Sequence, residues 1–183
     1  MTVEGTSPLQ NVLSNCLLLL PEWLKNKDDW QSLIINRRKP ETYRVFRYLA
    51  GGIRVCLHRF SRFYDGEAFM HPHPWQGAFY IVKGSYRMRL GYTTDLQEPE
   101  PTIISTLELT AGSSYAIDDP RTWHSVEPVT EYVYTLMVNG PPWASQLAHS
   151  QVKTTKGKDL ESLTPEGLEA FLAEYSAALA ERK

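Results

Sequence analysis

Three of the five histidines in this 183-residue chain have neighbours and spacing that suit a metal ion. His71 and His73 stand two residues apart in the run HPHPW, which leads into an apolar stretch that ends at Gly84. Side chains alternate between the two faces of a strand, so residues two apart share a face and their imidazoles can converge. His124 follows much later in the chain, in the segment DPRTWHSV. Three such imidazoles predict a site for a divalent transition metal.

The same residues also allow an interpretation without a metal. An HxH pair can arise by chance in a sequence with five histidines, and the prolines around this pair could mark a turn with solvated imidazoles. His124 would then be a hydrogen-bonded residue of the core. We expect His58 to lie on a strand in a structural role and His149 to lie at the surface.

Composition and charge narrow the class of protein. The formal net charge of −2 provides no basic surface, which argues against nucleic acid or an anionic membrane as the main partner. The apolar run Leu17–Leu20 is far too short to span a membrane, and no positively charged leader precedes it. We therefore expect a cytoplasmic protein, in which Cys16 and Cys56 are buried and unpaired rather than part of a disulfide framework.

A series of short strands is expected in the middle of the chain. The runs 43–50 and 53–60 are rich in β-branched and aromatic residues, and Gly51-Gly52 between them is typical of a two-residue hairpin. Many short strands divided by turn residues indicate an all-β protein, a barrel or jelly roll of two packed antiparallel sheets. The further strands are expected at 78–83, 85–92, 102–109, 114–117, 124–128 and 132–138.

Helices are expected before this β region. The apolar positions between Leu9 and Leu20 follow helical spacing, and Pro21 is expected to end that helix. A second, short helix is expected from Asp28, as its N-cap, to Ile34.

One more helix is expected after the β region. The segment 151–158 has the composition of a polar linker, and Thr164-Pro165 is typical of a helix start. The apolar stripe that follows predicts packing on the β domain or on a partner chain. We therefore divide the chain into a helical extension (1–40), a β-domain (41–143), and a linker with a helix (144–183).

The glycines and histidines together resemble the two motifs of the cupin superfamily. The first motif has a glycine, an HxH pair and a second glycine, matched here by Gly66, His71, His73 and Gly84. The second motif has a glycine, a proline and a histidine, matched by Gly112, Pro120 and His124. The resemblance covers roughly residues 43–140. It implies one cupin-type barrel or jelly roll, with a metal held by the three histidines.

The sequence departs from the cupin motif at the fourth ligand. The glutamate that cupins usually carry falls at Gly77, so the resemblance implies a site of three histidines without a carboxylate. Cupins of the thiol dioxygenase type hold Fe(II) in this way. Gln76 stands next to that position and would reach the metal only if the Pro74-Trp75 turn shifted the strand register.

Three neutral ligands would leave the charge of a divalent metal uncompensated and several positions open. Such a site favours an anionic, chelating substrate together with water or dioxygen. We expect Fe(II) first, with Ni, Mn, Zn or Cu as alternatives, and a non-haem oxygenase acting on a small anionic metabolite. A metal-dependent isomerase or lyase, with a tyrosine or His58 as general base, stays open. So does a non-catalytic cupin that binds a sugar or another small ligand.

Other side chains could contact such a substrate. We expect Tyr134 and Arg59 to act in catalysis by orienting it. Two arginines could hold a carboxylate through paired hydrogen bonds, and aromatic side chains could line the mouth of the pocket. These residues are Arg87, Arg89, Tyr80, Trp75, Trp123 and Tyr115. Surface arginines and core aromatics are also common on strands, and sheet edges could pair two copies into a homodimer.

Overall fold

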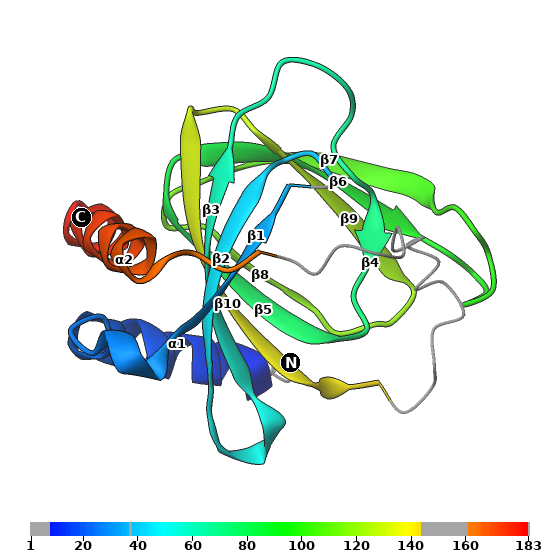
Figure 1. Ribbon diagram of the computed structural model, residues 1–183. Helices are drawn as coiled ribbons and strands as arrows, with labels where there is room; N and C mark the ends of the chain where they lie inside the picture. Colours follow the sequence, from blue (N-terminus) through cyan, green and yellow to red (C-terminus); the bar gives the residue numbers. More distant parts are fainter. Residues whose placement is uncertain (1–7, 37, 144–160, 183) are drawn as a thin grey trace.

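Two antiparallel β-sheets face each other, with two helices on one outer side, in the computed structural model, which describes residues 8–36, 38–143 and 161–182 (Figure 1). The larger sheet contains, in spatial order, β1 (Gln31–Ile35), β2 (Thr42–Tyr48), β3 (Arg54–Ser61), β10 (Tyr132–Pro142), β5 (Trp75–Lys83) and β8 (Ser114–Ile117). The smaller sheet contains β4 (His71–Pro72), β9 (Thr122–Pro128), β6 (Ser85–Tyr92) and β7 (Thr102–Thr110). This confirms the all-β jelly roll, although the two sheets do not join into a closed barrel within the described residues.

Both helices cover the outer face of the larger sheet, as Figure 1 shows. The apolar stripe of α1 (Pro8–Trp23) and that of α2 (Pro165–Ala180) pack in one cluster with sheet residues such as Val45, Leu57 and Leu136. Thr164 caps α2 as predicted, because its Oγ accepts a hydrogen bond from the Gly167 N–H at 3.1 Å.

Residues of the opposite strand parity fill the space between the two sheets. Phe46, Cys56 and Met137 from the larger sheet belong to one buried cluster. Tyr86 and Met88 from the smaller sheet belong to a second. Side chains alternate between faces along each strand, so one face of the larger sheet meets the helices and the other meets the smaller sheet.

The helix expected from Asp28 to Ile34 is wrong. A single 3₁₀ turn (Lys27–Asp29), capped by the Asn26 side chain, leads into strand β1 instead. The apolar run Leu33-Ile34-Ile35 is too short to distinguish the spacing of a helix from that of a strand. Five residues of this segment pair with β2, and this pairing stabilises the strand.

Two expected boundaries differ in detail. α1 continues past Pro21 to Trp23, because a proline perturbs the turn before it more than the residues after it. The β2–β3 hairpin exists, but it is not the two-residue type: a 3₁₀ turn (Ala50–Gly52) connects the strands, and Tyr48 pairs with Arg54.

Three further sequence-based expectations concern the linker, the cysteines and membrane-spanning segments. The linker at 151–158 and His149 lie outside the described residues. Cys16 and Cys56 are buried and free, as predicted. In the described part of the chain, no helix has the length and apolar character needed to cross a membrane.

Candidate metal centre

His71 and His73 come from the place where the chain crosses from the smaller sheet to the larger one, and His124 comes from the neighbouring strand β9. His71 lies on β4 and is paired directly opposite His124 on β9, in the smaller sheet. His73 lies in the short link between β4 and β5, and β5 belongs to the larger sheet. Cross-strand pairing and the sheet-to-sheet link, rather than one continuous strand, therefore bring the imidazoles together.

The ring nitrogens of these histidines lie close enough to share one ion. One ligand atom from each residue lies within 4.8 Å of the others, and His73 Nε2 and His124 Nε2 are 2.8 Å apart. With metal–nitrogen bonds of about 2.0–2.1 Å, two ligands at right angles stand about 3 Å apart. The His73–His124 pair thus already has the spacing of neighbouring ligands, and a small movement of His71 would complete the set.

Partners in the surrounding shell orient two of the rings. The Phe69 carbonyl lies 3.1 Å from His71 Nδ1 and accepts its proton, which leaves Nε2 free for a metal. The Phe69 ring also stacks on His71, with the ring planes 9° apart. Tyr115 OH lies 3.4 Å from His124 Nδ1, so Nε2 is again the nitrogen that faces the cluster.

All three imidazoles are neutral at neutral pH. Burial lowers the pKa of His71 to about 4 and is the main cause. Burial and the neighbouring imidazoles hold the pKa of His73 well below its usual value, and burial and His71 do the same for His124. Neutral imidazole is the form that binds a metal, so the donor set fits a divalent transition ion.

A cavity of about 230 Å³ opens onto the histidines, and we call it the histidine pocket. Apolar side chains such as Phe60, Phe79 and Met137 form much of its wall. Among the described residues, the charged side chains that line it are Arg38, Lys39 and Arg44, and no aspartate or glutamate lines it. A pocket of this size and charge suits a small anion.

The position of the usual cupin glutamate contributes no ligand. Gly77 lies on β5, and a Cβ there would meet the Phe79 ring at 3.0 Å. Gln76 is exposed and does not line the histidine pocket.

The two residues expected to act in catalysis lie on the other face of the larger sheet. Arg59 Nη1 forms an ion pair with Glu174 Oε2 of α2 at 2.6 Å, and the Tyr134 hydroxyl donates to the same carboxylate at 3.4 Å. Strand alternation explains this placement, because His58 and Thr135, one position away, face the pocket instead.

Two of the expected aromatic residues also lie outside the histidine pocket. Tyr80 packs against the helix-side cluster under Arg182, whose guanidinium is 5.6 Å from the ring centroid. Trp75 lies beside His73, but its ring faces the Arg54 guanidinium at 4.8 Å. Of the four aromatic residues proposed for the pocket mouth, Tyr115 does line the pocket.

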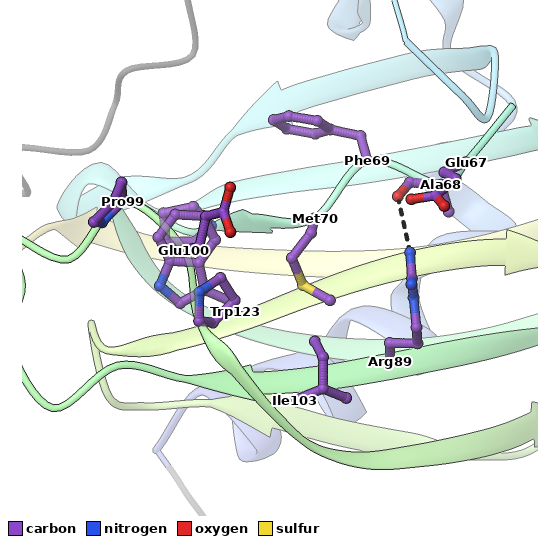
Figure 2. A pocket seen from close by; sticks show the side chains of 11 residues that line it. Glu67, Ala68, Phe69, Met70, Arg89, Pro99, Glu100, Ile103 and Trp123 are labelled. Atoms are coloured by element: carbon purple, nitrogen blue, oxygen red, sulfur yellow. Dashed lines mark hydrogen bonds between the residues drawn. The ribbon is translucent and has the colours of Figure 1, made fainter.

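The remaining candidates lie on the outer face of the smaller sheet. Figure 2 shows Arg89 and Trp123 in a second, open cleft of about 580 Å³, the outer cleft, where Arg89 Nη2 donates to the Ala68 carbonyl at 3.5 Å. Arg87 is on the same face, in an exposed ion pair with Glu127. These arginines and Trp123 have the parity opposite to that of the pocket residues on β6 and β9.

Sequence reasoning did not single out Arg44 and Thr135, which line the pocket beside His58. Arg44 Nε donates to His58 Nε2 at 2.9 Å, and His58 Nδ1 lies 3.3 Å from Thr135 Oγ. Correct pairing of the β2–β3 hairpin would have placed Arg44 opposite His58. The glycine pair indicated a turn but not its length, so the sequence carried no signal that specified this pairing.

Comparisons with known proteins identify no family. No protein-family model and no curated protein matches the chain. Among solved structures, Fe(II)-HppE with the alternative substrate (S)-1-HPP aligns with a TM-score of 0.49 and 14% identity, over 62% of this chain and 57% of that one. Hydroxypropylphosphonic acid epoxidase from S. wedmorenis aligns with a TM-score of 0.48 and 13% identity, over 62% and 56%. A conserved protein of unknown function from Streptococcus pyogenes aligns with 0.41 and 13%, over 58% and 79%. The chain thus matches little more than half the length of the first two structures.

Proposed function

We propose that this protein is a non-haem metal-dependent oxygenase that acts on a small anionic metabolite. The observation that carries the proposal is the convergence of His71, His73 and His124 in the lining of a pocket that also contains basic side chains. We place Fe(II) first among the metals because the three-histidine donor set without a carboxylate resembles that of cupins of the thiol dioxygenase type. Imidazole nitrogens do not by themselves select one metal, so Ni, Mn, Zn and Cu are the alternatives. A ferrous ion there would activate dioxygen, and the substrate that is oxidised would supply the electrons that the net reaction consumes.

The side chains of the pocket would bind and orient the substrate. The basic side chains attract an anion, and the phenylalanine and methionine walls exclude water around it. The Tyr86 hydroxyl donates to the Tyr115 hydroxyl at 3.0 Å, and His124 Nδ1–H would donate to the same oxygen. The Tyr115 proton would then be directed to a bound molecule.

The pocket favours an oxygenase over an isomerase or lyase, because the described residues that line it offer no free general base. Burial raises the pKa of Tyr115 well above its usual value, so the phenol stays protonated. Both nitrogens of His58 are engaged, one with Arg44 and one with Thr135. Proton abstraction from a substrate carbon therefore lacks an evident acceptor among these residues.

Oxygen uptake tests this proposal. Protein purified without a polyhistidine tag is loaded with Fe(II) under anaerobic conditions and mixed with small carboxylates, phosphonates and thiols. We expect at least one compound to cause oxygen consumption that matches its own loss, and His73→Ala to abolish it. Turnover without oxygen would favour the isomerase or lyase. Iron-loaded protein that consumes no oxygen with any anion would contradict the oxygenase.

A further inference from the structure

Arg44 is a charged group in the wall of the histidine pocket without a carboxylate partner. Within the described residues it forms no ion pair, and its side chain donates one hydrogen bond, from Nε to His58 Nε2. On the opposite face of the same two strands, Arg47 pairs with Asp29 and Arg59 pairs with Glu174. Partial burial of an unpaired cation costs free energy that an anionic ligand would recover.

A buried histidine fixes the direction of this guanidinium. His58 is 3% exposed, and burial together with Arg44 and Arg54 holds its pKa well below the usual value, so the ring is neutral. Because Nε2 accepts from Arg44, the single ring proton is on Nδ1, and Thr135 Oγ accepts it at 3.3 Å. The chain Thr135–His58–Arg44 therefore occupies Nε and leaves the two terminal nitrogens for another partner.

Those terminal nitrogens define the class of ligand. Two parallel N–H donors match the two oxygens of a planar carboxylate, whereas a lysine ammonium offers a single point charge. The Arg44 charge also helps to lower the pKa values of His71 and His73, so the guanidinium and the histidine cluster share one electrostatic environment. A molecule held by both would have to be short, because the cavity is only about 230 Å³.

We propose that Arg44 binds the carboxylate of a short-chain carboxylic acid and that His58 and Thr135 position it for this role. A role of this site in catalysis rests on the proposed function. Carboxylate binding itself needs only protein groups and no metal. His58 is a positioning residue, since it acts through Arg44. The assignment can therefore be tested in metal-free protein, apart from any turnover.

Binding of propionate to the metal-free protein, measured by calorimetry and thermal shift, is the test. We expect saturable binding of propionate and little binding of propionamide, its uncharged counterpart. Arg44→Gln should weaken propionate binding about tenfold or more, since a hydrogen-bonded charge pair is lost. Arg38→Gln removes the same charge from the same pocket and should weaken it less.

A second pair of variants tests the positioning role. His58→Leu should weaken propionate binding, and His58→Gln, which keeps an acceptor for Arg44 Nε, should restore most of it. Equal binding of propionate and propionamide, no binding of propionate, or a larger loss in Arg38→Gln than in Arg44→Gln would overturn the assignment.

Metal content separates this test from the test of the oxygenase. If Arg44→Gln holds as much metal as the unchanged protein and fails to bind propionate, the carboxylate site stands. That result holds whatever reaction the metal supports. If propionate binds as predicted and the three histidines hold no metal, the oxygenase fails and the carboxylate site remains.

Discussion

The Nε2 atoms of His73 and His124 face each other across 2.8 Å, and two neutral imidazoles at this distance need a proton or a metal ion between them. His71 stands opposite His124 in the β4–β9 ladder and supplies the third nitrogen. Each ring is buried enough to stay neutral, so proton competition with a metal is weak at neutral pH. The three imidazoles therefore have the positions and the protonation state that metal binding requires in the metal-free protein.

Substitution of a single ligand should remove the metal. We expect His73→Ala and His124→Ala to lower metal affinity by more than about a hundredfold, beyond the 10–100-fold typical of supporting residues. Tyr115→Phe, which removes the hydroxyl beside His124 Nδ1, should lower it by about tenfold. Elemental analysis and metal titration measure both effects. Gln76→Ala is the matched control: its exposed side chain should leave affinity unchanged, and a loss there would indicate a fourth ligand.

Spacing in the sequence was sufficient to find the histidines but not their neighbours. The HxH pair and His124 belong to a recognisable sequence motif. The sequence around an arginine on a strand does not show which face of the sheet its side chain occupies. Arg59 was chosen and Arg44 was not. The difference between them is strand parity, which depends on a sheet orientation that no local pattern reports.

The β2–β3 hairpin shows how one turn decides this parity. A two-residue turn at Gly51-Gly52 would pair Ala50 with Ile53 and so place Arg44 opposite Arg59. The longer connection pairs Arg44 with His58 instead. Both glycines have positive φ, 73° and 75°, so Gly-Gly predicted a turn correctly without specifying its length. The pairing of Arg44 with His58 therefore depends on a turn length that the glycine pair does not specify.

The tight turn between β5 and β6 depends on Gly84. Its φ is +84°, and a Cβ there would lie 2.5 Å from both Thr130 Oγ and the Tyr132 carbonyl oxygen. We expect Gly84→Ala to lower the free energy of unfolding by about 2–4 kcal/mol, from backbone strain and a clash with backbone.

Gly112 supplies the matched control for this turn. Its φ is +91°, but a Cβ would meet nothing within 4 Å, so Gly112→Ala should cost only about 1 kcal/mol. Denaturant unfolding measures both variants. Equal losses of unfolding free energy in the two variants would mean that the close contacts at Gly84 do not contribute to the cost of its substitution.

The ion pair between β3 and α2 should stabilise the helix against the sheet without affecting the site. Arg59 is 16% exposed and touches Glu174 at 2.6 Å, so Glu174→Gln should cost about 1–2 kcal/mol of unfolding free energy. Glu127→Gln, in the exposed pair with Arg87, should change it by less than about 0.5 kcal/mol. Metal content and oxygen uptake should stay unchanged in both. A loss of turnover in Glu174→Gln would reinstate Arg59 as a residue of the reaction.

In the described part of the molecule, desolvation keeps four histidines neutral, three of them buried and His71 half-buried, so stability should depend on pH. Burial depresses the pKa values of His58, His71, His73 and His124 in the folded state, whereas unfolded histidine takes up a proton near pH 6.5. Below that pH the unfolded state binds more protons, so the free energy of unfolding should fall as pH drops from about 6.5 toward 4.

Each of these histidines contributes up to about 1.4 kcal/mol per pH unit in that window. Urea unfolding of metal-free protein at several pH values measures the slope. His58→Gln should make the slope shallower. A free energy of unfolding that is constant between pH 6.5 and 5 would contradict neutral, buried histidines.

The fold as a whole could be predicted because its signals are local and repeated. Alternating strands, glycine turns and a capped C-terminal helix each point to the same two-sheet architecture. The pocket could not be predicted from the sequence, because its wall includes residues of β2, β3, β9 and β10 from two sheets. Its depth depends on how those sheets pack. A site formed between layers is a property of the whole molecule.

Anomalous diffraction from crystals loaded with Fe(II) under anaerobic conditions, recorded at the iron absorption edge, tests the central claim most directly. We predict one strong peak about 2.0–2.2 Å from the Nε2 atoms of His71, His73 and His124, with no protein carboxylate bound to it. A peak elsewhere, or none between these imidazoles in protein that has taken up no other metal, would contradict the metal centre.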